Sequence, residues 1–216
     1  PSLVALSCGQ RRSSCGGRRQ ERRSAFAKFD TLECVSKVSG RTALLRATVV
    51  IVANGGLRAL TYRAVAAEAG VSHGLVRHHF GTRDQLIADA MDFAIDESLR
   101  GTNMLNGGSS PADFAAGIES LADREGDIQA FQYELLLEAR RRPELRAHAE
   151  RHYRAYRDAI LQQLRRLGVE RAEEEGLADL IWFALDAIVF KQLVVPGDVG
   201  PALARIRALV EAAARP

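Results

Sequence analysis

The chain has 216 residues, of which 47% are hydrophobic and 26% are charged, a balance typical of a globular protein with a buried core. Its formal charge of +3 permits a polyanionic partner without requiring one, and the acidic residues are concentrated in the second half. All 3 cysteines precede residue 40, which excludes a disulfide framework in the rest of the chain, and no uninterrupted apolar run reaches the roughly 18 residues of a membrane span.

Residues 1–38 carry the segment RRSSCGGRRQERR, a mixture of Gly, Ser and Arg with little to bury. We expect a disordered basic N-terminal extension, for which a solvated tail is favoured over an arm that touches nucleic-acid backbone. The run PSLVALSC has an apolar stretch too short for a signal sequence, and no basic segment precedes it. We therefore expect a cytoplasmic protein with no membrane association.

The segment RTALLRATVVIVANGG begins the periodic part of the chain, with an apolar stripe through Leu44, Ala47 and Val50 or Ile51. This pattern predicts a helix that stops at the Gly pair. Short helical segments follow to about Arg100, and we place a first helical domain at 39–100.

The segment LTYRAVAAEAGVSHGLVRHHFGTRDQLIADAM has the features of a helix-turn-helix. Thr61 is suited to cap a helix over 62–69, Gly70 permits a tight turn, and Ser72 is suited to cap a second helix. Small Ala66 allows the helices to approach closely, while Val71 and Val76 supply an apolar plug. Thr82 and Gln85 then predict a capping box for the next helix.

The second of these helices has one inward and one outward face. If Val76 points inward, His79 and Phe80 lie beside it, whereas the basic and polar residues around the open Gly74 face outward. Such a face suits a helix in the major groove, which is about 12 Å wide. The alternative is a helical pair with a solvated basic face, and the coincidence of caps, turn, plug and basic face disfavours it.

The segments LTYRAVAAEAGVS, HHF and GTRDQLI, within Arg41–Met91, resemble the tetracycline-repressor (TetR) family of bacterial transcription regulators. The resemblance implies a first helix over Arg41–Asn54, dimerisation through the last two long helices, and a set of DNA contacts. That set, with the cap residue Ser72 added, is Thr61, Tyr62, Ser72, His73, Gly74, Leu75, Arg77, His78, His79 and Arg83. Leu75 stands where the family usually has Thr or Ser, and Arg77 where it usually has Tyr, so family base preferences do not transfer to these two positions.

After the linker GTNMLNGGSSP, every long segment has helical periodicity, namely 111–124, 127–141, 144–167, 171–194 and 199–214. The predicted fold class is all-α, an N-terminal helix-turn-helix domain followed by a helical ligand-binding and dimerisation domain at 101–216. The run LADLIWFALDAIVFKQLVV is apolar nearly all round, so it must be buried on two faces. We expect a homodimer in which this helix and 199–214 form a four-helix interface.

Aromatic and polar residues embedded in the later helices are candidates for the lining of a ligand pocket. The predicted pocket residues are Phe131, Glu134, Leu137, Tyr156, Trp182 and Asp186. The alternative for each is a surface or interface position on an amphipathic helix. His148 and His152 have the spacing of a two-histidine metal face, but a solvated charged face is favoured, and we expect neither a metal nor a cofactor.

These features favour a dimeric DNA-binding regulator, a repressor that a small-molecule effector releases from a palindromic double-stranded operator. The alternative is a constitutive or architectural dimeric DNA-binding protein without an effector. A third hypothesis is an enzyme that uses Glu134, Glu138 or Asp186. No catalytic signature in the sequence supports it, so we expect that the protein is not an enzyme.

Overall fold

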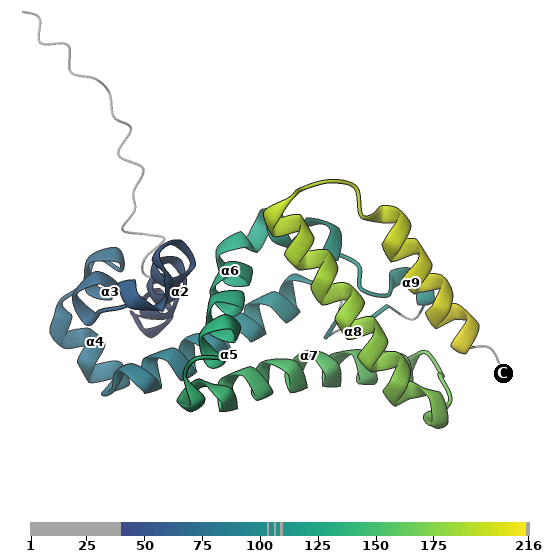
Figure 1. The fold of residues 1–216 in the computed structure, drawn as a ribbon, viewed down its shortest axis with the longest axis horizontal. Helices are drawn as coiled ribbons and strands as arrows, with labels where there is room; N and C mark the ends of the chain where they lie inside the picture. Colours follow the sequence, from purple (N-terminus) through teal and green to yellow (C-terminus); the bar gives the residue numbers. More distant parts are fainter. Residues whose placement is uncertain (1–39, 103, 106, 109, 215–216) are drawn as a thin grey trace, which may run out of the picture. The chain divides into compact units, whose positions relative to one another are not determined.

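A computed structural model describes residues 40–102, 104–105, 107–108 and 110–214, which belong to one compact unit, Val38–Pro216. Every regular element in these ranges is a helix (Figure 1), so the predicted all-α class is confirmed. The predicted disordered extension at 1–38 lies outside the described residues. The division at residue 100 into two domains stays a prediction.

The first part of this unit holds α2 (Gly40–Ala59), α3 (Tyr62–Glu68), α4 (His73–Phe80) and α5 (Arg83–Gly101). Leu44, Val52 and Leu57 bury one side of α2. The Gly pair interrupts this helix as expected, because Gly56 adopts φ 67° and ψ 176°. The chain then makes one more short helical stretch to Ala59.

Residues 111–124 do not form the continuous helix that their periodicity predicts. Two short 3₁₀ turns, Pro111–Asp113 and Ile118–Ser120, precede α6 (Leu121–Ala139). Ala115 and Gly117 have φ values of 52° and 96°, which a right-handed helix cannot contain. The expected break near Gly126 is a kink instead, with Glu125 at φ −134° and ψ 33° inside α6.

The remaining helices follow the predicted ranges closely. A 3₁₀ turn at Pro143–Leu145 leads into α7 (Arg146–Arg166), which is followed by α8 (Arg171–Val194) and α9 (Gly200–Ala213). Helix α6 packs against α2, α5, α7 and α8, so it joins the first helices to the later ones. One continuous cluster of buried apolar side chains runs through all of them.

Candidate DNA interface and internal cavity

The turn between α3 and α4 has the local structure that its sequence predicts. The Thr61 hydroxyl accepts a hydrogen bond from the Ala64 backbone N–H at 3.1 Å. Gly70 takes φ 67°, and the Val71 N–H then donates to the carbonyl of Ala66 at 2.9 Å. A side chain at position 70 would strain this left-handed conformation, so glycine sets the angle at which α4 leaves α3.

The plug beneath the turn is apolar and almost fully buried. Of the two predicted plug residues, Val76 is 0% exposed and Val71 is only partly buried. Val65 and Phe80, which are 0% and 3% exposed, complete the plug. His79 differs from the prediction, because it is exposed rather than turned inward beside Val76. Its ring lies 5.6 Å from that of His78 and 6.1 Å from that of Phe80, measured between centroids.

The two other predicted caps are only partly formed. Ser72 stands at the N-cap of α4, but its hydroxyl makes no capping hydrogen bond. Thr82 caps α5 by accepting from the Gln85 N–H at 3.1 Å. The Gln85 side chain donates to Asp89 at 2.8 Å, so the reciprocal half of the capping box is replaced by a bond one turn along the helix.

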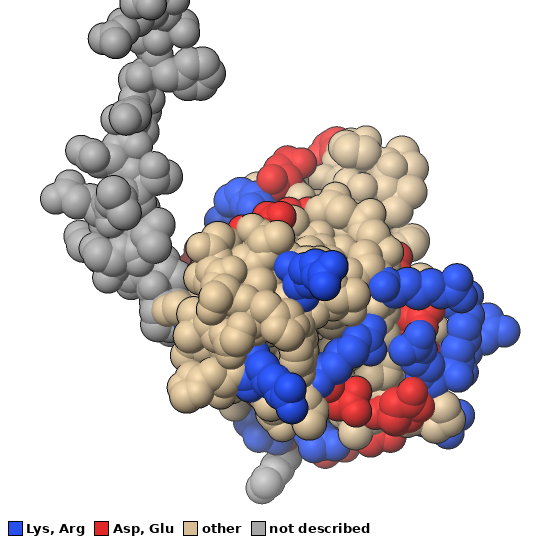
Figure 2. Space-filling view, turned by 90° about the vertical axis from the view of Figure 1, so that its left-hand side faces the viewer, with Lys and Arg blue, Asp and Glu red and all other residues tan. Residues whose placement is uncertain are grey.

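The outer face of α4 is open to solvent. The exposed residues on and before this helix are Ser72, His73, Gly74, Arg77, His78 and His79, and Leu75 is half-buried. Beyond its own helix backbone and its chain neighbours, a Cβ atom at Gly74 would meet no atom of the described residues within 4 Å. Figure 2 shows Lys and Arg side chains spread over this side of the unit, with acidic side chains toward its margins. The surface is therefore sterically open, with separate basic side chains on a largely uncharged face.

Two of the predicted DNA-contact residues also hold the fold together. The Tyr62 hydroxyl donates to the carbonyl of Gly81 at 3.0 Å, which ties α3 to the start of α5. Arg83 donates from Nη2 to the carbonyl of Leu57 at 2.7 Å and from Nε to that of Leu60 at 3.4 Å. Part of the hydrogen-bonding capacity of the Arg83 guanidinium is thus used at the C-terminal end of α2. The side chain of Thr61 is exposed.

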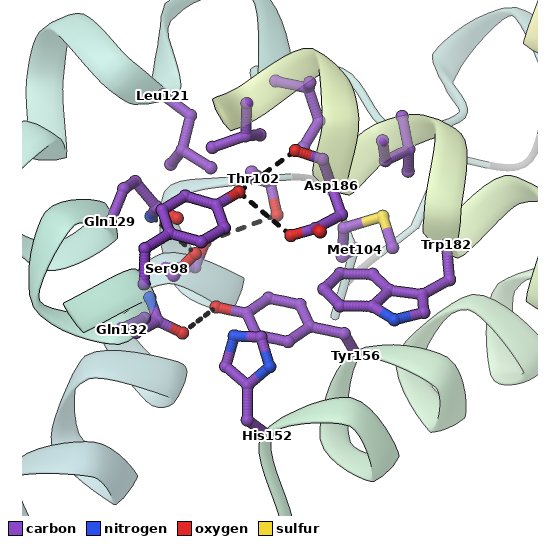
Figure 3. A pocket seen from close by; sticks show the side chains of 14 residues that line it. Ser98, Thr102, Met104, Leu121, Gln129, Gln132, His152, Tyr156, Trp182 and Asp186 are labelled. Carbon is purple, nitrogen blue, oxygen red and sulfur yellow. Dashed lines mark hydrogen bonds between the residues drawn. The ribbon is translucent and has the colours of Figure 1, made fainter. Parts of the chain in front are cut away.

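An internal cavity lies among α5, α6, α7 and α8, with a volume of about 30 Å³. Its lining combines apolar and polar side chains (Figure 3). The lining residues are Ser98, Thr102, Met104, Ile118, Leu121, Gln129, Gln132, Tyr133, His152, Tyr156, Trp182, Leu185, Asp186 and Val189. A volume of about 30 Å³ holds a water molecule, whereas ligand pockets usually measure about 300–1,000 Å³.

Hydrogen bonds between helices fix several polar groups of this lining. The Tyr133 hydroxyl lies 2.9 Å from Asp186 Oδ1 and 3.0 Å from the Asp186 carbonyl, and it donates toward both (Figure 3). The Tyr156 hydroxyl donates to Gln132 Oε1 at 2.8 Å. Burial raises the pKa of Tyr133, Tyr156 and Asp186, although the bond from Tyr133 opposes the rise at Asp186. Both tyrosines are therefore neutral donors.

Aromatic rings form one wall of the cavity. The rings of Tyr156 and Trp182 stack with 4.9 Å between centroids and 8° between planes, and the ring of His152 lies 4.8 Å from that of Tyr156. Among the described residues, neither His152 Nδ1 nor Trp182 Nε1 has a hydrogen-bond partner. Burial lowers the pKa of His152 to about 4, so its imidazole is neutral at pH 7.

Three of the six predicted pocket residues, Tyr156, Trp182 and Asp186, line this cavity. The other three do not. Phe131 is fully buried in the core, Leu137 is 61% exposed, and Glu134 Oε2 points at Gly56 of α2. The sequence shows that α6 is amphipathic but not that α2 covers one of its sides, so it could not indicate which side faces the cavity.

His152 was expected on a solvated charged face, but it is 3% exposed and belongs to the cavity wall. Its place one helical turn before Tyr156 was the sequence signal for this. His148 is half-buried, and its Nδ1 lies 3.1 Å from Arg151 Nη2. The residues that the structure describes contain no group of three His, Cys, Asp or Glu placed to hold a metal ion.

Other lining residues were missed, above all Ser98 and Thr102 of the α5 end and Gln129 and Gln132 of α6. The Gln129 Nε2 group donates to Ser98 Oγ at 3.0 Å, in a buried contact between two helices. These residue types are common on helix surfaces, so only their burial reveals them.

Within the described ranges, no helix is long and apolar enough to cross a membrane.

Comparison with known proteins gives matches over both parts of the chain. A family model described as "Bacterial regulatory proteins, tetR family" matches residues 44–90, and one described as "Tetracyclin repressor-like, C-terminal domain" matches residues 109–216. An HTH-type transcriptional repressor of Mycobacterium tuberculosis is 38% identical over 88 residues, which are 41% of this chain and 43% of the repressor. The HTH-type transcriptional repressor KstR2 of Mycolicibacterium smegmatis is 28% identical over 102 residues, 44% of this chain and 50% of KstR2. The chain thus aligns with half or less of the length of these relatives.

Solved structures share the fold over most of the chain. A transcriptional regulator from Rhodococcus sp. Rha1 has a TM-score of 0.60 at 22% identity, over 82% of this chain and 96% of its own. The multidrug binding protein EbrR complexed with ethidium has a TM-score of 0.53 at 24% identity, over 82% and 99% of the two chains. A regulator from Saccharomonospora viridis in complex with choline has a TM-score of 0.54 at 17% identity, over 80% and 93%. From the two family matches and the helix-turn-helix, the chain belongs to the tetR family of bacterial regulatory proteins.

Proposed function

We propose that this regulator is a dimeric repressor that binds a palindromic operator through α4 and is released when a small molecule enters the cavity. The observation that carries the proposal is the pairing of an open, basic α4 face with an internal cavity walled by aromatic and polar side chains. The family assignment supports the proposal that the protein binds DNA. The cavity supports the proposal that a small-molecule effector binds inside the protein.

The exposed side chains of α4 are suited to DNA contact. Within the described residues, no hydrogen bond or ion pair engages the side chain of exposed Arg77, so its guanidinium is available for phosphate or a guanine edge. The open surface at Gly74 permits close approach of the helix to the groove. We therefore assign the recognition role to α4, with Thr61 and Tyr62 of the α3 start beside the phosphate backbone.

The dimer is inferred from the outer side of α8. Its inner side is buried through Ile181, Leu185 and Val189. Its outer side carries a stripe with helical spacing that is exposed in the single chain. The members of this outer stripe are Leu180, Phe183, Ala187, Phe190 and Val194. Large apolar stripes of this kind mark interfaces, and a two-fold contact between identical helices covers both copies.

Helix α5 offers a route from the cavity to the DNA-binding helices. At its start, Arg83 bonds the carbonyls of Leu57 and Leu60, and at its end Ser98 lines the cavity. A ligand larger than about 30 Å³ must displace lining groups, and a shift of α5 moves the turn that precedes it. The two α4 helices of a dimer then no longer fit half-sites about 34–36 Å apart.

Similar proteins are named in ways that agree with this proposal. The matched M. tuberculosis protein and KstR2 are both named repressors. EbrR and the S. viridis regulator, which share the fold, are described in complex with ethidium and choline. By analogy, we infer repression and a small organic effector for this chain.

The test begins with selection of genomic fragments that the full chain binds, followed by footprinting of the bound site. A palindromic footprint that ligands from a small-molecule panel abolish supports the proposal. Release must be lost when the cavity is narrowed by an added methyl group, as in Ser98→Thr, which keeps the hydroxyl that accepts from Gln129, while operator binding without ligand is retained. Loss of release together with intact DNA binding identifies the cavity as the effector site.

The small volume of the cavity favours the second candidate, a constitutive DNA-binding protein. In that case the aromatic wall only stabilises the packing of α6, α7 and α8. Thermal unfolding of the protein with each ligand of the panel separates the two functions, because a ligand that binds the native state raises the unfolding temperature. If no ligand of the panel raises it, the constitutive function stands.

A further inference from the structure

The charge balance inside the cavity is uneven. Asp186 carries the only carboxylate in its lining, and none of the lining residues is Lys or Arg. Its Oδ1 atom receives a neutral hydrogen bond from Tyr133, and no Lys, Arg or His side chain of the described ranges forms an ion pair with it. The cavity thus holds a partly buried carboxyl group that forms no ion pair with a described Lys, Arg or His side chain.

Asp186 and Trp182 lie four residues apart on α8, so their side chains project to the same side of the helix. Figure 3 shows both on the cavity, with the ring of Tyr156 beside the indole. The parallel stack of Tyr156 and Trp182 presents π-electron density, which attracts a cation lying over a ring. An acid and an aromatic pair are therefore available to one bound group.

His152 adds to this preference because it carries no opposing charge. It is 3% exposed, and burial lowers its pKa to about 4, so it does not repel a cation at neutral pH. His152 Nδ1 and Trp182 Nε1 have no hydrogen-bond partner among the described residues. These two atoms can bond a hydroxyl or carbonyl carried by the same ligand.

We propose that the cavity takes a monovalent organic cation with apolar substituents, such as a quaternary ammonium, whose charge lies between the Asp186 carboxylate and the Trp182–Tyr156 stack. The inference rests on the proposed function in that the cavity is taken as the effector site. A volume of about 30 Å³ is too small for such a cation, so binding displaces flexible lining side chains such as Met104.

The test uses the full chain and two matched pairs of probes. One pair is choline and its neutral analogue in which a tert-butyl group replaces the trimethylammonium group. The other is benzyltrimethylammonium and its neutral tert-butyl analogue. Trp182 is the single tryptophan of the chain, so its fluorescence reports binding at this cavity. We expect each cation to bind at least about tenfold more tightly than its neutral analogue.

Two variants locate the cause of that preference. Asp186→Asn keeps an acceptor for the Tyr133 hydroxyl but removes the charge, so the preference should fall to within about twofold. Glu134→Gln removes an acid that lies on α6 outside the cavity lining and should leave the preference unchanged. Neutral analogues that bind as well as the cations, absence of binding by either cation, or a preference that survives Asp186→Asn overturns the proposal.

Operator binding is measured separately with the same probes. A cation that binds with the expected preference but leaves operator affinity unchanged supports the cation site and contradicts the proposed release of DNA. A neutral ligand that releases DNA from a protein without cation preference supports the proposed function and overturns the cation site. The two proposals can therefore fail independently.

Discussion

At the scale of single residues, the exposed arginine of α4 gives the most direct test of the DNA interface. Replacing Arg77 with Ala should weaken binding to all sequences and make the slope of log affinity against log salt shallower by about 0.9, the value for one phosphate contact. Arg154, an exposed arginine of α7, is the matched control. Arg77→Ala and Arg154→Ala with the same salt slope would remove Arg77 from the phosphate contacts.

Gly74 separates DNA contact from folding. A Cβ atom at this position meets no protein atom within 4 Å, and alanine is favoured over glycine inside a helix by up to about 1 kcal/mol. Gly74→Ala should therefore leave the free energy of unfolding equal or higher, yet weaken operator affinity about tenfold because the methyl group meets DNA. That loss corresponds to about 1.4 kcal/mol.

The control for this prediction is Gly126→Ala in α6, where the added Cβ makes only an ordinary contact with Leu193 at 3.8 Å. It should leave operator affinity unchanged. Chemical denaturation and fluorescence anisotropy with operator DNA measure the two quantities. Unchanged affinity in Gly74→Ala shows that this part of α4 does not lie against the groove.

His152 predicts a pH dependence of stability. Its pKa is about 4 in the folded protein, against 6.5 for a histidine in an unfolded chain, so between these values the unfolded chain binds more protons. The free energy of unfolding then rises with pH across this window. The contribution of His152 to it is lost as the pH falls from 6.5 toward 4. The full effect is on the order of 3 kcal/mol.

Urea denaturation of the natural protein and of His152→Gln, at pH 7 and at pH 4, measures the contribution of His152 to the free energy of unfolding. Other titrating groups, including Asp186, are common to both proteins, so the difference between the two pH responses belongs to His152. The natural protein should lose more stability than the variant as the pH falls. Equal losses would mean that the buried imidazole is already protonated or is hydrated in the folded state.

At the scale of elements, α8 carries a prediction about assembly. Phe183 is 62% exposed on the outer stripe, whereas Ala184 and Ile188 pack partly against the core. Phe183→Glu should therefore produce folded monomers and abolish operator binding, because a buried charge opposes its copy across the two-fold axis.

Gln162→Glu places the same side chain on the exposed part of α7 and is the control. Sedimentation and circular dichroism distinguish dissociation from unfolding. A natural protein that sediments as a monomer at micromolar concentration, or a Phe183→Glu variant that remains a dimer, contradicts this interface.

At the scale of the whole molecule, effector and operator must act on each other equally. A ligand that weakens operator binding about a hundredfold must itself bind about a hundredfold more weakly to the DNA-bound protein, a coupling of about 2.7 kcal/mol. Titration of the ligand with and without operator measures its affinity for the DNA-bound and for the free protein. If ligand affinity is the same in both titrations, that ligand binds without inducing release.

Local patterns in the sequence determined much of this protein before any tertiary contact was considered. The Thr61 cap, the Gly70 turn and the period of α8 depend on neighbours within a few residues, so the all-α class and the helix-turn-helix were predictable. The break at residues 111–120 was not, because the left-handed Ala115 has no sequence signature.

Only the tertiary structure decided which side of each helix meets which neighbour. Helical periodicity places residues on a face, but burial of that face depends on helices far away in the chain. This is why Leu137 proved exposed, His152 proved buried in the cavity wall, and Arg83 proved to bond the carbonyls of Leu57 and Leu60. The position of the Asp186 carboxyl group is likewise a property of packing, since it arises where α5, α6, α7 and α8 bring one acid to a cavity whose lining contains no Lys or Arg.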